Sequence, residues 1–307
     1  MLPDLRTRLG PLTLRSPLVL AASPWGADAV RLAGSGIGAL TMNSIGPTPR
    51  SGHPEPTLYD WGEGLLNAVG LANPGAEAAI ADLQRLKDDL KKQDVVLIVS
   101  IFADTAEGYF DVAQVISHLE PELVEVNISC PNVAEEFGAP FATQCASAAA
   151  ATAAARAALT CPISVKLAPN VPDVVQIAEA VLRAGADMLT ASNTMPGMVI
   201  DVEARRPVLS NLTGGVSGAA LRPIAVRMVY ELYAAFPGVP IIGTGGVLHG
   251  RDAVEMVMAG ATAVGLATVA HRHGAAGLRR VLTELDEWMT AHGVRSLDEI
   301  RGAAHAR

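Results

Sequence analysis

The chain has 307 residues, of which half are hydrophobic and only 4% aromatic, and its formal net charge is −8. This length suits one α/β barrel with insertions, and a core filled by Ala, Val, Leu and Gly suits a packed parallel barrel better than an aromatic-rich sandwich. The net charge is negative and no cluster of Lys or Arg stands out, so the sequence lacks the basic surface that binds nucleic acid.

The three cysteines, Cys130, Cys145 and Cys161, show neither CxxC nor Cys/His spacing. We therefore expect no disulfide framework, no structural zinc and no iron–sulfur cluster within this chain. The first residues lack the basic and apolar regions of a signal peptide, and no apolar stretch reaches membrane-spanning length. These features predict a cytoplasmic protein with no metal site and no membrane partner.

Short apolar runs recur along the chain, and each is followed by a helical pattern. Runs of this length, several rich in Val and Ile, are typical of strands buried on both faces. The predicted strands are Pro17–Ala22, Gly38–Met42, Val95–Ile101, Leu123–Ile128, Ile163–Leu167, Met188–Ala191, Val239–Thr244 and Ala263–Ala267. Helix candidates between them include Ala76–Gln93, Cys145–Leu159, Val171–Ala184, Ala219–Ala235 and Arg251–Ala259.

Eight strands that alternate with helices predict an α/β fold, a (β/α)₈ TIM barrel in a single domain over residues 1–307. The alternative is an open doubly wound sheet, which usually places a phosphate-binding glycine fingerprint after its first strand. The glycines here cluster late instead.

Three further segments frame the predicted barrel. Leu5–Leu14 reads as a hairpin that turns at Gly10-Pro11 and would plug the bottom of the barrel. Gly46–Gly75 is too long for a simple βα loop, and long loops at the carboxyl ends of barrel strands commonly carry function. Leu282–Arg307 is expected to form a charged amphipathic helix and an end segment.

The late glycines follow the seventh and eighth predicted strands, in Ile241–Val247 (IIGTGGV) and Ala263–Thr268 (AVGLAT). Loops after those strands commonly form the phosphate site of a barrel, where backbone N–H groups and a helix N-terminus meet the anion. The alternative is a pair of tight turns without a ligand. Because both loops carry the signal together, we expect phosphate binding.

The fourth predicted strand ends in Val126–Asn132 (VNISCPN). A cysteine in a loop at the carboxyl end of a strand is placed to accept a proton, so Cys130, flanked by Asn127 and Asn132, is a candidate catalytic base. The alternative for a lone cysteine is a small buried hydrophobic residue. We assign that structural role to Cys145 and Cys161.

Amide side chains gather at the same predicted rim. They are Asn67, Asn127, Asn132 and Asn193, with Thr194 beside the last of them. Amides suit a flat ring that bears alternating C=O and N–H groups, which indicates a pyrimidine-like ligand. The segment Thr213–Gly218 is expected to add flexible backbone.

Lys166 lies inside the apolar strand Ser164–Leu167, where a lysine is costly to bury without an anionic partner. It either extends into the helix layer or contacts the electron-rich edge of a cofactor, and we favour the contact with a cofactor.

Six separated segments, NISCPN, LLNAVGLANPG, VKLAPNV, SNTMPGMVID, NLTGGVSGAALRPIAVRMVY and IIGTGGV, together resemble the class 1, soluble dihydroorotate dehydrogenases. The resemblance spans roughly Ala21 to Ala270, and the run through Gly214–Tyr230 is most similar to the NAD-linked branch. The resemblance implies an FMN-containing catalytic subunit that oxidises dihydroorotate to orotate in de novo pyrimidine (UMP) biosynthesis. It also implies a homodimer, or an assembly with a second subunit that carries FAD and a 2Fe–2S cluster.

The resemblance further implies a role for each matching residue. Cys130 would remove a proton from C5 of dihydroorotate while C6 passes hydride to N5 of FMN. The four asparagines and Thr194 would hold the pyrimidine, and Lys166 would contact the isoalloxazine. The residues that would line the FMN are Ala22, Ser23, Asn127, Lys166, Gly218, Gly245, Gly246 and Thr268.

Two features depart from the family pattern. After the second strand the family usually has a lysine in a T-K-S or T-K-T setting, whereas Thr41–Ile45 places Asn43 there. Asn43 cannot neutralise the orotate carboxylate, so we expect Arg50 in the following loop to do so. The second departure is the acidic segment Ala134–Gly138 in the Cys130 loop, where family members are often basic or glycine-rich.

Three alternative functions therefore stay open. The first is an FMN-dependent oxidoreductase that acts on another, neutral dihydropyrimidine, which Asn43 favours. The second is a non-catalytic flavin-binding paralogue. The third is a non-redox phosphate-binding barrel such as a sugar-phosphate isomerase, in which Cys130 and the asparagines would have no obvious role.

Overall fold

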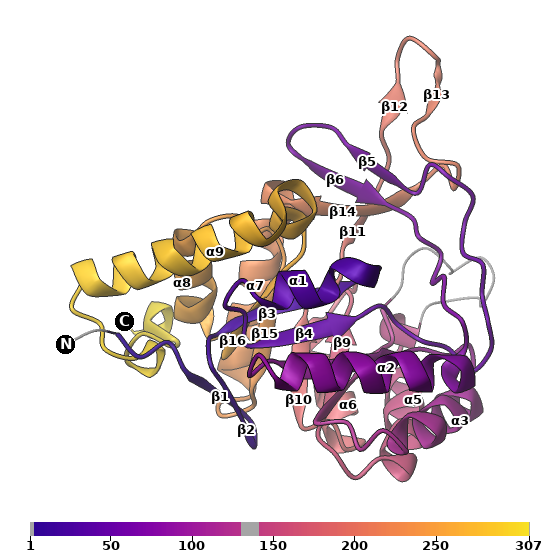
Figure 1. Ribbon diagram of the computed structural model, residues 1–307, viewed down its shortest axis with the longest axis horizontal. Helices are drawn as coiled ribbons and strands as arrows, with labels where there is room; N and C mark the ends of the chain where they lie inside the picture. The colour runs from indigo at the N-terminus through magenta and orange to yellow at the C-terminus, as the bar shows by residue number, and fades with distance from the viewer. Residues whose placement is uncertain (1–2, 130–140, 307) are drawn as a thin grey trace.

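Eight parallel strands close into a barrel at the centre of the molecule (Figure 1). The computed structural model describes residues 3–129 and 141–306. In barrel order the strands are β10 (Met188–Ala191), β15 (Ile241–Thr244), β16 (Ala263–Leu266), β3 (Leu18–Ser23), β4 (Ala39–Met42), β7 (Val96–Ile101), β8 (Leu123–Asn127) and β9 (Ile163–Leu167). All eight lie where the sequence predicts strands, and their closure confirms the barrel over the open doubly wound sheet.

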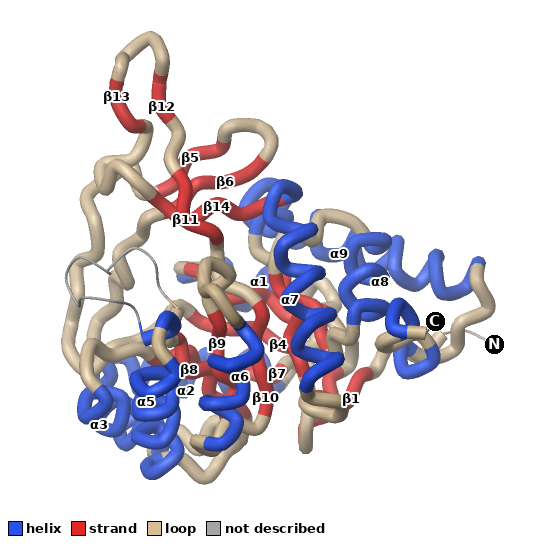
Figure 2. Tube along the Cα trace, turned by 180° about the vertical axis from the view of Figure 1, so that it is seen from behind, coloured by secondary structure: helices blue, strands red, loops and turns tan. Residues whose placement is uncertain are grey.

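Helices cover the outside of the barrel (Figure 2). They are α1 (Ala29–Ala33), α2 (Ala76–Lys91), α3 (Ala106–Ser117), α5 (Cys145–Ala158), α6 (Val174–Arg183), α7 (Arg222–Ala235), α8 (Gly250–Ala259) and α9 (Thr268–Ala291). The five predicted helices are confirmed with small shifts at their ends, whereas α1 and α3 had no predicted range.

The last helix corrects the prediction for the C-terminal segment. α9 begins at Thr268, directly after β16, and not at Leu282. Gly274 adopts a φ of 55° inside it, and this kink interrupts the helical periodicity that the sequence pattern depends on. The end segment then folds into two short 3₁₀ helices, Leu297–Glu299 and Ala303–His305.

Side chains alternate between the two faces of the barrel wall, as strand geometry requires. Along β8, Val124 and Val126 pack outward in the core that strands and helices share. Glu125 and Asn127 point inward and bond to neighbouring strands and loops. The outer face of the wall is therefore apolar, while the upper half of the barrel interior is polar.

A hairpin closes the amino-terminal end of the barrel, as predicted. Strands β1 (Thr7–Leu9) and β2 (Leu12–Leu14) pair antiparallel, and Gly10 turns between them with a φ of 60°. Leu9 and Leu14 pack against the inward residues at the start of the barrel strands, among them Val19, Ile98 and Met188. The hairpin thus supplies an apolar floor below the polar upper half.

A small antiparallel sheet lies beyond the carboxyl ends of the barrel strands (Figure 1). Its order is β11 (Met195–Gly197), β14 (Gly214–Gly218), β6 (Gly64–Asn67) and β5 (Leu58–Asp60). The predicted long loop Gly46–Gly75 therefore contains two strands. Thr213–Gly218, expected as flexible backbone, is instead mostly the paired strand β14.

The glycines of β14 explain why this segment pairs so closely. A Cβ added at Gly214 would lie 2.6 Å from the backbone oxygen of Asn67, and one at Gly215 would clash with the side chain of Thr194. Composition alone indicates flexibility, but here glycine permits close approach. A second hairpin, β12 (Ile200–Asp201) with β13 (Arg206–Pro207), projects away from the barrel (Figure 2).

Among residues 3–129 and 141–306, no helix has the length and apolar character needed to cross a membrane.

The floor of the barrel gives a stability prediction. Leu9→Ala should lower the free energy of unfolding by about 2–5 kcal/mol, because the fully buried side chain leaves a cavity that the closed barrel cannot fill. Denaturant titration measures the change. Val202→Ala, at a site that is 76% exposed, is the control and should change it by less than about 0.5 kcal/mol. Equal effects of the two substitutions would contradict the role of the hairpin.

Candidate active site

Two adjoining pockets open at the carboxyl ends of the barrel strands. The polar pocket is lined by residues that include Ser23, Asn43, Ser44, Asn67, Asn127 and Asn193. The glycine pocket is lined by residues that include Ser217, Thr244, Gly245, Gly246, Gly265 and Thr268. Ala22, Lys166, Asn193 and Thr194 line both, so the two pockets form one continuous site.

The glycine pocket has the geometry of an anion site. Gly245 and Gly246 turn with φ of 138° and 78°, and a Cβ on Gly246 would lie 2.6 Å from the backbone nitrogen of Arg222. Only glycine lets the loop fold this tightly beside α7. On the other side, α9 begins at Thr268, so its unpaired N–H groups and positive dipole end face the same pocket.

Gly218, the remaining predicted glycine, lies at the end of β14 with a φ of 97°. It does not line either pocket among the described residues, but a Cβ there would lie 3.6 Å from Thr268. Ser217 next to it bonds to the Thr268 hydroxyl at 2.9 Å. The upper sheet and the start of α9 are therefore joined at the rim of the glycine pocket.

Asn127 and Asn193 are held in fixed orientations in the polar pocket. The Asn127 Nδ2 donates to Ser44 Oγ at 2.9 Å, and its Oδ1 accepts from Ser129 Oγ at 3.0 Å. The Asn193 Nδ2 donates to the carbonyl and the hydroxyl of Ser129, both at 3.1 Å, and its Oδ1 accepts from the Thr194 N–H at 2.8 Å. Ser129 thus forms hydrogen bonds with both amide side chains.

Asn43 and Asn67 also line the polar pocket. Asn43 Nδ2 donates to the carbonyl of Ala72 at 2.9 Å, and Asn67 Nδ2 donates to the carbonyl of Gly215 at 2.9 Å. Asn43, at the position of the family lysine, therefore fastens the long loop after β4. It brings no positive charge to the pocket.

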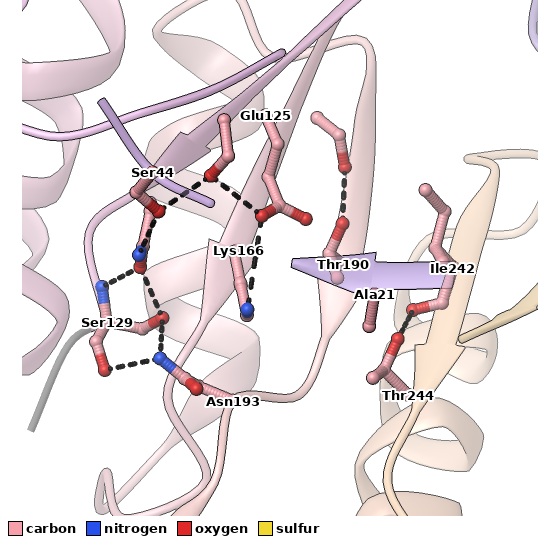
Figure 3. A network of polar contacts seen from close by, with 12 residues as sticks. Ala21, Ser44, Glu125, Ser129, Lys166, Thr190, Asn193, Ile242 and Thr244 are labelled. Carbon is pink, nitrogen blue, oxygen red and sulfur yellow. Dashed lines mark hydrogen bonds and ion pairs between the residues drawn. The ribbon is translucent and has the colours of Figure 1, made fainter. Parts of the chain in front are cut away.

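Lys166 points into the barrel, between the two pockets, and not into the helix layer (Figure 3). Its Nζ lies 3.9 Å from Oε1 of Glu125, and both side chains are buried. Glu125 is the anionic partner that a buried lysine requires. Within the described ranges, Lys166 is the one charged side chain that lines either pocket.

Arg50 is placed beside the polar pocket. Its Nε donates to the carbonyl of Gly70 at 2.8 Å, and its backbone pairs with Asn73. Gly70 lines the pocket, and Arg50 does not do so in this conformation. Cys130 and Asn132 fall within residues 130–140, outside the described residues, so their roles stay predictions.

A histidine contact supports the other edge of the site. Ser23 Oγ lies 2.8 Å from Nε2 of His271, and the His271 ring packs against Trp25 at 4.6 Å between centroids. Burial lowers the pKa of His271, which favours the neutral ring at this contact. Trp25 and His271 thereby fix the side chain of Ser23 at the pocket edge.

The sequence analysis missed the hydroxyl and carboxylate groups that support the asparagines. Ser44, Ser100, Ser129 and Glu125 are all buried beneath or beside the polar pocket. Glu125 could have been predicted from the sequence. It stands two positions before Asn127 on the same strand, so both side chains lie on one face of that strand. The serines gave no comparable signal, because a buried serine does not stand out in an apolar run.

The fold and site define a (β/α)₈-barrel protein with a glycine-rich pocket joined to an amide-lined pocket. The family model described as dihydroorotate dehydrogenase matches residues 4–289. The chain therefore belongs to the dihydroorotate dehydrogenase family, which confirms both the resemblance and the expected oxidoreductase class.

Individual relatives agree with this placement. The chain is 37% identical over 304 residues to the dihydroorotate dehydrogenase B (NAD(+)) catalytic subunit of Methanocaldococcus jannaschii, with 98% of each chain covered. It is 41% identical over 298 residues to the protein of the same name from Desulforudis audaxviator, with 96% of this chain and 95% of the relative covered.

A solved structure supports the fold. The dihydroorotate dehydrogenase from Eimeria tenella, crystallised with ferulenol, matches with a TM-score of 0.85 at 24% identity. The match covers 99% of this chain and 89% of that chain.

The glycine pocket gives a prediction that separates backbone strain from crowding. Gly246→Ala and Gly238→Ala both place alanine at a positive φ, which costs about 1–2 kcal/mol. Nothing lies within 4 Å of a Cβ at Gly238, whereas one at Gly246 meets the Arg222 backbone. Gly246→Ala should therefore lower the free energy of unfolding more, as measured by denaturant titration. Equal losses would contradict the tight packing of this loop.

Proposed function

We propose that the chain is an FMN-dependent dihydroorotate dehydrogenase that oxidises dihydroorotate to orotate in de novo pyrimidine biosynthesis. The observation that carries the proposal is the continuity of the two pockets: the glycine pocket, whose backbone geometry suits an anion, adjoins the polar pocket, and Lys166 lines both. This arrangement suits a cofactor with a phosphate at one end and a polar planar ring at the other.

The residues present fit FMN. Gly245, Gly246 and the start of α9 at Thr268 would hold the phosphate through backbone N–H groups, with Gly218 closing the rim. Ala22, Ser23, Asn127 and Lys166 would contact the ring. When bound, FMN would supply the two-electron acceptor of the reaction.

The substrate would be held by the amide side chains of the polar pocket. Asn67, Asn193 and Thr194 line it, and Asn132 and Cys130 follow β8 in the adjoining segment. We assign removal of the C5 proton to the thiolate of Cys130, as the hydride leaves C6. Asn43 and Arg50 lie at the side of the pocket where we expect the carboxylate of orotate, with Arg50 as its counter-ion.

The relatives are named as catalytic subunits, and this supports a partner subunit. We propose that the chain forms a homodimer and delivers its electrons to a second subunit that carries FAD and a 2Fe–2S cluster.

A second candidate function keeps the fold and the cofactor but changes the substrate to a neutral dihydropyrimidine. It is favoured by Asn43, which leaves Lys166 as the one charged side chain among the described residues that line the pockets. In this reading Arg50 keeps its contact with Gly70 and has no carboxylate to neutralise.

An anaerobic visible spectrum tests the proposal. The purified protein should show the bands of oxidised FMN, and dihydroorotate should bleach them. Bleaching by dihydrouracil but not by dihydroorotate would support the neutral substrate instead. A protein that is not bleached by either compound would be a flavin-binding paralogue, and one that does not bind FMN would contradict the proposal.

The role of Cys130 gives a kinetic prediction. Cys130→Ala should slow the bleaching by dihydroorotate by about 10²–10⁴-fold, the range expected for loss of a general base, while the spectrum of the oxidised protein stays unchanged. Cys161→Ala is the control, because burial raises the pKa of the Cys161 thiol and suits it to a structural role. If dihydroorotate bleached Cys130→Ala as fast as Cys161→Ala, Cys130 would not be the residue that removes the proton.

A further inference from the structure

A buried relay of hydrogen bonds runs from Glu125 to the amide of Asn127 in the polar pocket (Figure 3). Ser100 Oγ donates to Glu125 Oε1 at 3.1 Å, and Ser44 Oγ lies 2.9 Å from Ser100 Oγ. Asn127 Nδ2 then lies 2.9 Å from Ser44 Oγ. Glu125, Ser100, Ser44 and Asn127 are each more than nine-tenths buried, so water does not compete for these groups.

The carboxylate fixes the direction of every bond in this relay. A carboxylate only accepts, and a hydroxyl has a single proton, so the proton of Ser100 is committed to Glu125. Ser44 must therefore donate to Ser100, which leaves only lone pairs facing Asn127. The Asn127 side chain can meet them with its N–H group but not with its oxygen.

Backbone groups hold the same orientation of both amides. The hydroxyl and the backbone N–H of Ser129 donate to Asn127 Oδ1 at 3.0 and 3.2 Å. Asn193 Nδ2 donates to the carbonyl and the hydroxyl of Ser129, and its Oδ1 accepts from the Thr194 N–H at 2.8 Å, so the backbone fixes Asn193 without the relay. Both N–H groups of Asn193 are engaged by Ser129. Its oxygen accepts from the Thr194 N–H and, at a long 3.5 Å, from the Thr194 hydroxyl, a weak contact that a ligand N–H can replace.

Glu125 also acts on the charge of the site. Its Oε1 lies 3.9 Å from Lys166 Nζ, inside the barrel where no bulk solvent screens the pair. An ammonium ion beside a carboxylate attracts a second anion less strongly than an isolated ammonium ion does, because the carboxylate cancels part of its electrostatic potential. The carboxylate therefore moderates the positive charge that Lys166 presents to both pockets.

We propose that Glu125 is a positioning residue that sets the polarity of the site, by directing the hydroxyls of Ser100 and Ser44 so that Ser44 accepts from the Asn127 N–H, and by balancing Lys166. In this state Asn127 offers an N–H donor to a ligand carbonyl, and Asn193 offers an oxygen to a ligand N–H. That pattern is complementary to a cyclic imide. The inference rests on the proposed function, because it assigns the flavin and the pyrimidine to these pockets.

The two actions of Glu125 are separable by mutation. Glu125→Gln removes the charge beside Lys166 and, with an amide that both donates and accepts, no longer dictates the direction of the relay. Ser100→Ala interrupts the relay but keeps both charges. Ser164→Ala is the matched control, because Ser164 forms a different buried hydroxyl pair, with Thr190 at 2.8 Å, in the same barrel interior.

The experiment compares FMN-loaded wild type with these three variants in two measurements. Spectroelectrochemical titration gives the midpoint potential of bound FMN, and spectral titration with orotate gives its dissociation constant. Glu125→Gln should raise the potential, because the unmoderated ammonium of Lys166 stabilises the anionic reduced flavin.

Ser100→Ala should weaken orotate binding by up to about tenfold, because Ser44 can then turn its proton toward Asn127, and it should leave the potential close to that of wild type. Ser164→Ala should change neither. An unchanged or lower potential in Glu125→Gln would overturn the action on Lys166. Orotate affinity in Ser100→Ala equal to that in Ser164→Ala would overturn the relay, and this comparison holds even if Glu125→Gln does not fold. A wild-type protein that does not bind FMN would contradict the proposed function and not the relay.

Discussion

The ion pair between Glu125 and Lys166 is the constraint on which the rest of the site depends. Two opposite charges are enclosed in a barrel, 3.9 Å apart and almost without solvent contact. Desolvating such a pair costs several kcal/mol, and a well-packed apolar pair would stabilise the fold as well or better. The barrel tolerates this cost because its floor is apolar and closed by the β1–β2 hairpin, while the upper interior is polar throughout. The charges therefore serve the pockets above them more than they serve stability.

The sequence predicts the barrel because its strands are buried on both faces and read as apolar runs at regular intervals. It also predicts which strand ends carry the site, since the asparagines and late glycines stand where strands stop. It does not predict the upper sheet. The strands β5, β6 and β14 are short and rich in glycine, and their pairing depends on close contacts such as that between Gly215 and Thr194, which composition does not reveal. The start of α9 was not predicted either, because the kink at Gly274 interrupts the helical spacing of the apolar residues.

The sequence predicts the side chains that line the pockets. It does not predict the buried side chains that hold them in place. Asn127 and Asn193 stood out at the ends of predicted strands, Asn67 in the long loop, and Lys166 because a lysine is rare in an apolar strand. The serines and Glu125 that orient them were not identified, although Glu125 shares a strand face with Asn127. Asn43 is the main departure from the family pattern, and the structure gives it a role in fastening the loop at Ala72. Among the described residues that line the two pockets, Lys166 carries the positive charge.

The most direct measurement of the central claim is a crystal structure of the protein with FMN and orotate bound. The account predicts the phosphate against Gly245, Gly246 and Thr268, and the flavin ring within hydrogen-bond distance of Lys166 Nζ, with Glu125 still beside that ammonium. It also predicts orotate between Asn67, Asn127 and Asn193, with the Asn127 N–H and the Asn193 oxygen turned toward it. A flavin bound elsewhere, or a Lys166 directed away from both flavin and Glu125, would contradict the account.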